Sequence, residues 1–164
     1  MISNNIINQI SLMLTLTVLL ISACTDVRDR KVPNEVTFAG MATGLILAAA
    51  VSPKVAGIRF LCLIFLFFFG MLKLMGMGDL KLCMAVTALR GPEEASLTLL
   101  FGAFMLLVYC LFTDAKNTVL MMKDTVALFT TGTPIPKRSD RLYPLAAFLA
   151  LGYPAAWIAT NVRW

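Results

Sequence analysis

Six apolar runs separated by short polar segments constrain this chain more than any other feature. A membrane-spanning helix needs about 20 apolar residues. Most of the runs reach or approach that length, and one, at 80–89, is too short by itself. The chain is 59% apolar and 14% charged, against about 45–50% and about 25% for soluble domains. We expect an all-α integral membrane protein, a six-helix transmembrane bundle in which residues 1–164 form one polytopic domain. The runs lie at 6–24, 36–51, 55–72, 80–89, 95–112 and 142–162.

The distribution of basic residues predicts the orientation of this bundle. Ten of the fourteen Lys and Arg residues lie in segments that alternate topology places on one side, and such residues accumulate on the cytoplasmic side of a membrane. The N-terminus is then expected outside. Topology therefore explains the net charge of +5, and we expect no nucleic-acid partner. The ten are Arg28, Arg30, Lys31, Lys73, Lys81, Lys116, Lys123, Lys137, Arg138 and Arg141.

Two other segments have local interpretations. Residues 119–129 are apolar except for Lys123 and Asp124, which predicts an amphipathic helix, either on the membrane surface or inserted. The four residues that end at Cys24 resemble a lipoprotein cleavage box. Because no basic residue precedes the first apolar run, we expect a retained helix instead. The chain has four Cys and no His, so we expect free thiols, no metal site and no cofactor.

Two acidic residues stand at predicted membrane boundaries on the same side. Asp26 closes the first helix, and Asp79 opens the fourth. Ionisable groups near membrane depth tend to face a bundle interior, so two such carboxyl groups can meet and share one proton. A pair of this kind supplies a general base for water and a general acid for a carbonyl oxygen. Asp29, three residues after Asp26 and on a similar helical face, is an alternative partner.

Residues around Asp79 fit that use. Gly76 and Gly78 allow unusual backbone conformations or a close approach of another segment. A helix that starts at Asp79 directs its N-terminal N–H groups toward the site. Pro33 and Asn34 precede the second apolar run, and we expect Asn34 to be the N-cap of its helix. Lys81 either extends its ammonium group to the membrane interface or holds charge in the site.

Both acidic segments resemble signatures of a known family. In the segment 26–34, Asp26 is followed seven positions later by Pro33 and then Asn34, and the segment 76–81 reads Gly-Met-Gly-Asp-Leu-Lys. The first resembles the DxxxxxxPN signature, and the second the GxGDxK signature, of the type IV prepilin peptidases. The resemblance implies that Asp26 and Asp79 are the catalytic pair. It also implies that Pro33, Asn34, Gly76, Gly78 and Lys81 support them.

The same resemblance implies a substrate and a location. The enzyme would be a GxGD-type aspartyl endopeptidase of the bacterial cytoplasmic membrane. It would remove the short leader of prepilins or pseudopilins, which carry a basic leader followed by an apolar helix, by cleaving after a small residue such as Gly. The other hypotheses are a small ion- or proton-translocating subunit and a non-catalytic pilus or secretion assembly protein. The sequence does not indicate an oligomeric state or a particular pilin.

Two departures from the family pattern refine this interpretation. We find no counterpart of the N-terminal methyltransferase region of the larger members. We therefore expect the short, peptidase-only type of tight-adherence (Flp) pilus systems, without N-methylation. Short relatives often have Pro-Tyr-Gly before the last helix, whereas residues 141–145 read Arg-Leu-Tyr-Pro-Leu.

Overall fold

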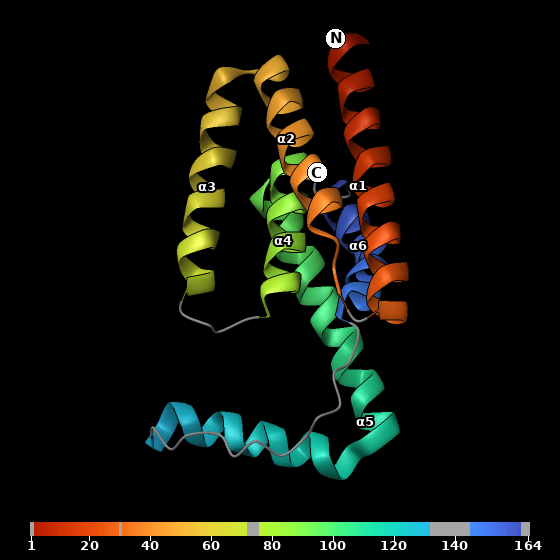
Figure 1. Ribbon diagram of the computed structural model, residues 1–164, viewed down its shortest axis with the longest axis vertical. Helices are drawn as coiled ribbons and strands as arrows, with labels where there is room; N and C mark the ends of the chain where they lie inside the picture. The colour runs from red at the N-terminus through yellow and green to blue at the C-terminus, as the bar shows by residue number, and fades with distance from the viewer. Residues whose placement is uncertain (1, 30, 72–75, 132–144, 162–164) are drawn as a thin grey trace.

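The computed structural model is all-helical over residues 2–29, 31–71, 76–131 and 145–161, which are the residues that it describes. These segments form six helices, and no strand occurs within them (Figure 1). Each helix contains one of the predicted apolar runs or most of it. The helices are α1 (Ile2–Asp29), α2 (Asn34–Val51), α3 (Pro53–Met71), α4 (Met77–Arg90), α5 (Pro92–Thr131) and α6 (Leu145–Asn161).

Three of the described segments are long and apolar enough to cross a membrane, by length and composition. They are Asn5–Asp29, Asn34–Val51 and Pro92–Lys116. Large apolar side chains also cover the outside of α3, where Leu61 and Phe65 are each 68% exposed. Exposed apolar surface of this extent is costly in water. Together these features indicate a membrane protein.

The shortest helix, α4, is the centre of the bundle. Its 14 residues contact all five other helices, and eight of its side chains are buried. Because α4 is surrounded by protein, it needs neither the length nor the continuous apolar surface of a lipid-facing helix. The buried residues are Leu80, Leu82, Cys83, Ala85, Val86, Thr87, Ala88 and Leu89.

Glycines allow the helices to approach α4 and each other closely. A Cβ atom on Gly44 of α2 would lie 2.5 Å from the carbonyl carbon of Ala88 in α4. A Cβ atom on Gly152 of α6 would lie 2.6 Å from the backbone nitrogen of Gly102 in α5. Backbones this close exclude any side chain, as is common where helices pack in membranes.

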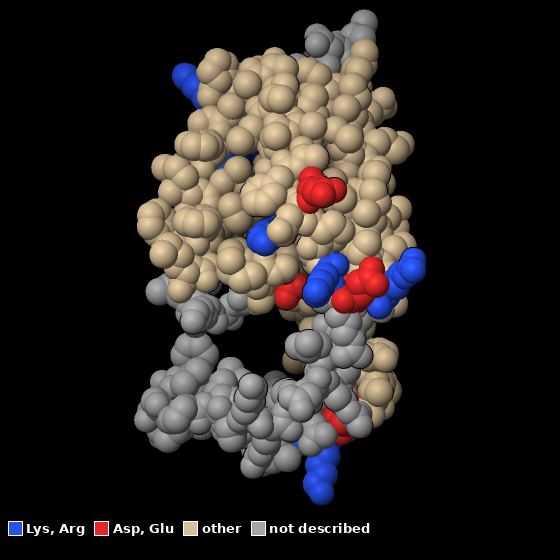
Figure 2. Space-filling view, viewed as in Figure 1, with Lys and Arg blue, Asp and Glu red and all other residues tan. Residues whose placement is uncertain are grey.

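A kink divides α5. Asp114 has φ −152° and ψ 64°, which are not helical angles, and the chain beyond it turns to run across the lower end of the bundle (Figure 1). The chain is helical again up to Thr131, which confirms the helix predicted at 119–129. Figure 2 shows most of the visible charged side chains toward the lower part of the bundle, below a largely uncharged surface.

Candidate active site

Asp26 lies in the last turn of α1, against the beginning of α6. Its Oδ2 atom accepts a hydrogen bond from the backbone N–H of Ala146, at 3.1 Å. The first N–H groups of a helix have no partner within that helix and carry partial positive charge, so they bind carboxylates well. This contact fixes Asp26 at the junction of α1 and α6, and it joins two residues that are 120 positions apart in the chain.

Asp79 is the third residue of α4 and is partly buried. It lies outside the three segments that qualify as membrane spans. Burial, and to a smaller extent the negative charge of Asp26, raise the pKa of Asp79 to about 6. Such an electrostatic effect requires the two carboxyl groups to be near one another. The two acids that the sequence singled out are thus close enough to interact electrostatically.

The ends of α1 and α4 that carry these acids lie at the same end of the bundle (Figure 1). The two signature segments also touch each other directly. Val32 Cγ2 lies 3.3 Å from the position that a Cβ atom on Gly78 would occupy. Lys81 Nζ donates a hydrogen bond to Asn34 Oδ1 at 2.8 Å. Lys81 therefore links the two segments.

The predicted capping role of Asn34 is wrong. Pro33 is the N-cap of α2, with φ −64° and ψ 127°, and no side chain caps this helix. Asn34 is the first helical residue, and its side-chain oxygen accepts from Lys81 instead. Pro33 shapes the entry into the helix, and its carbonyl accepts hydrogen bonds from the backbone N–H and the hydroxyl of Thr37.

The two signature glycines serve close approach, not unusual backbone angles. Gly76 is the N-cap of α4, with φ −60° and ψ 136°, which any residue can adopt. A Cβ atom there would lie 2.8 Å from Asp79 Oδ2, so a side chain would displace the carboxyl group. Gly78 lacks positive φ as well, and it makes room for Val32. The helix starts at Met77 and not at Asp79, which places Asp79 in its first turn.

Asp29, the alternative acid, is not part of this arrangement. Its side chain is 61% exposed and pairs with Arg28 at 3.9 Å. The acid with the seven-residue spacing to Pro33, Asp26, is the one whose charge acts on Asp79. The contact between Asp26 and α6 has no signal in the sequence, because its donor is a backbone N–H. Residues 141–144, which include the departure from Pro-Tyr-Gly, lie outside the described residues.

The site has the groups required for acid–base chemistry on a peptide bond. One partly buried carboxyl group has a raised pKa, and a second one accepts a backbone N–H. Environments that differ in this way allow one carboxyl to donate a proton while the other accepts one. Among the described residues no three His, Cys, Asp or Glu side chains are grouped so that they could hold a metal ion.

The helical architecture defines the chain as a membrane protein, and the two acids at one end of its bundle are the candidate site. It belongs to the type IV leader peptidase family, whose sequence model matches residues 13–111. The matched region runs from α1 into α5 and contains both acids and both signature segments. It is therefore a leader-peptidase-like protease. Neither a search of curated proteins nor a search of solved structures gave a match.

Proposed function

We propose that this protein is an aspartyl endopeptidase in which Asp26 and Asp79 activate one water molecule. The electrostatic interaction between the two carboxyl groups at one end of the bundle carries this proposal. The direct contacts between the signature segments, at Gly78 and at Lys81, hold the acids in one site. Family membership supports a peptidase, and the acid pair supports this chemistry for it.

The surroundings of the two acids suggest separate roles. We assign the base to Asp26, because the backbone N–H of Ala146 holds its carboxyl group in place. Asp79 is the better acid, because burial favours its protonated form. In this scheme Asp26 takes a proton from water, and the resulting hydroxide attacks the scissile carbonyl carbon. Asp79 gives its proton to the carbonyl oxygen. When the tetrahedral intermediate breaks down, Asp26 gives the proton that it took from water to the leaving nitrogen, and Asp79 takes a proton back from a hydroxyl group of the intermediate, which restores both acids.

The proposed substrate is a prepilin or pseudopilin, cleaved after a small residue at the end of its basic leader. Its apolar helix would lie in the membrane beside the bundle while the extended leader junction reaches the acids. The exposed apolar side chains of the helices suit a partner within the lipid. We infer that the protein is a multi-pass protein of the bacterial inner membrane with both acids at its cytoplasmic face. The segments predicted on the same side as the acids carry most of the basic residues, which accumulate on the cytoplasmic side of a membrane.

Single substitutions test this proposal. We expect Asp26→Asn and Asp79→Asn each to reduce leader cleavage by about 10²–10⁴-fold, the usual contribution of a general acid or base. Asp29→Asn is the matched control, since that side chain is exposed and pairs with Arg28, and it should cleave normally. The measurement is the mass of a co-expressed prepilin over time, at equal amounts of inserted enzyme. Normal processing by either of the first two variants removes that residue from the mechanism.

A further inference from the structure

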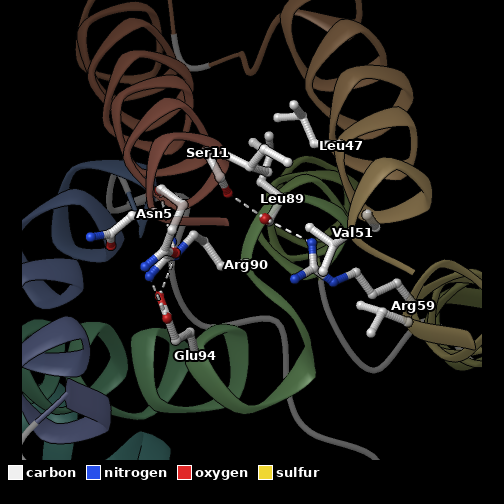
Figure 3. Close-up of a pocket in the computed structure, with 12 residues that line it drawn as sticks. Asn5, Ser11, Leu47, Val51, Arg59, Leu89, Arg90 and Glu94 are labelled. Carbon is white, nitrogen blue, oxygen red and sulfur yellow. Dashed lines mark hydrogen bonds and ion pairs between the residues drawn. The ribbon is translucent and has the colours of Figure 1, made fainter. Parts of the chain in front are cut away.

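A cavity of about 680 Å³ opens at the end of α1 and α4 opposite the acid pair. Figure 3 shows how α1, α2, α3 and the α4–α5 junction surround it. One wall is apolar and comes from α2 and α3, with Leu47, Val51 and Val55. The other wall is polar and includes Arg59, Arg90 and Glu94. A pocket with one apolar and one charged wall suits an amphipathic ligand.

Arg90 and Glu94 neutralise one another within this cavity. Arg90 Nη2 and Nε donate to the two carboxylate oxygens of Glu94 at 2.6 and 2.7 Å, and the two side chains are only 5% and 12% exposed. Arg90 Nη1 donates to the side-chain oxygen of Asn8. These two-point bonds satisfy both charged groups, so the pair needs no ligand.

Arg59 differs, because only one edge of its guanidinium group is used. Its Nη1 atom donates to the backbone oxygens of Ala88 and Leu89 at 2.9 and 2.8 Å, and Ser11 Oγ also donates to that oxygen of Leu89. Within the described part of the chain, Nε and Nη2 of Arg59 make no hydrogen bond. They lie beside Gly91, 3.9 Å or less from the position of an added Cβ atom.

The free edge of Arg59 leaves the cavity positively charged. The last backbone carbonyl groups of α4 carry about half a negative charge in total, so they neutralise at most about half of the positive charge of Arg59. The carboxylate of Glu94 is already paired with Arg90. A partly buried guanidinium without a full counter-charge favours an anion. Nε and Nη2 form the fork that binds two oxygens of a phosphate group at once.

We propose that this cavity binds the phosphodiester headgroup of an anionic phospholipid. The phosphate contacts Nε and Nη2 of Arg59, and an acyl chain lies along Leu47, Val51 and Val55. Arg59 is six residues after the start of α3, which at a rise of 1.5 Å per residue is about 9 Å along the helix. From that depth a long side chain reaches the headgroup layer. The apolar wall favours a lipid over free phosphate.

The test uses the full chain in a neutral detergent, titrated with phosphatidylglycerol or phosphatidylcholine and followed by native mass spectrometry. We expect the wild type to prefer phosphatidylglycerol by about tenfold, and Arg59→Gln to lose that preference. Lys54→Gln is the matched control. It removes one charge from the same end of α3, where Lys54 is exposed and does not line the cavity. If the wild type and Arg59→Gln show the same preference for phosphatidylglycerol over phosphatidylcholine, the proposal is overturned.

Two further arms keep the test decisive. Val51→Trp narrows the cavity without changing any charge, so it should also lose the lipid preference. If Arg59→Gln fails to fold because α4 loses its carbonyl contacts, Val51→Trp decides alone, and retained preference overturns the proposal. Inorganic phosphate and glycerol phosphate are the competitors. Displacement of phosphatidylglycerol by either at similar concentration shows a free-anion site and also overturns the lipid assignment.

Discussion

At the scale of single residues, sequence spacing singled out two acids but did not indicate the hydrogen-bond partners of the residues around them. The spacing from Asp26 to Pro33 and the GxGD pattern around Asp79 pointed to the two carboxyl groups that interact in the structure. Asn34 looked like a helix cap because it stands beside a proline and before an apolar run. Its partner is Lys81, 47 positions away. Local pattern cannot show a hydrogen bond that depends on how distant segments pack.

The raised pKa of Asp79 predicts how stability depends on pH. Below about pH 4 this carboxyl is protonated both in the folded and in the unfolded protein, so it contributes nothing. Between pH 4 and 6 the folded state holds a proton that the unfolded state loses, and above pH 6 the folded state contains a costly ionised group. The wild type should therefore lose stability relative to Asp79→Asn as pH rises through this window.

Thermal unfolding in detergent at several pH values measures this difference. We expect Asp79→Asn to be more stable by about 1–2 kcal/mol above pH 6, and equal to the wild type at pH 4. This difference in the free energy of unfolding is smaller than the value that the full pKa shift corresponds to, because the carboxyl group is partly exposed to solvent. Asp26→Asn should move the window only slightly downward, since burial is the larger cause. A constant difference at all pH values would contradict the raised pKa.

At the scale of helices, the sequence predicted the outer elements well and α4 poorly. Hydropathy identifies helices that face lipid, so the long apolar runs gave their positions to within a few residues. The run at 80–89 looked too short, yet it belongs to the helix that contacts all others. The sequence feature that could have indicated close packing against α4 is the pair Gly40 and Gly44, which lie one helical turn apart in α2. Both face α4, where Gly40 lies against Ala85 and Gly44 against Ala88.

Gly44→Ala tests the importance of this close approach. The added Cβ atom would lie within 2.7 Å of backbone atoms of Ala88 and Leu89, and backbone cannot turn aside as a side chain can. We expect a loss of about 1–3 kcal/mol, which lowers Tm by several degrees in a chain of this size. Gly57→Ala is the matched control, because no atom lies within 4 Å of its added Cβ. A similar Tm for both variants would show that α2 and α4 are more loosely packed.

At the scale of the whole molecule, α1 and α4 connect two chemically different ends. One end carries Asp26 and Asp79, whose carboxyl groups interact electrostatically, and the other holds Arg59 against the last carbonyl groups of α4. Contacts at both ends join α4 to other helices, with Ser11 of α1 at the cavity and Asn34 of α2 near the acids. These contacts at both ends of α4 help to hold in place the helix that carries Asp79. No sequence pattern contains this arrangement, because it depends on three-dimensional packing.

The contact between the two signature segments predicts a specific disulfide. The Cβ atom of Val32 lies 3.6 Å from the position of a Cβ on Gly78, within the range of about 3.5–4.5 Å that disulfides require. In a variant whose four native cysteines are replaced, Val32→Cys with Gly78→Cys should cross-link on mild oxidation. Peptide mass spectrometry before and after reduction detects the link. Val32→Cys with Gly57→Cys, which joins opposite ends of the bundle, should not cross-link. Failure of the first pair to cross-link, while maleimide labels both of its thiols, would show that the segments lie apart, and the acids with them.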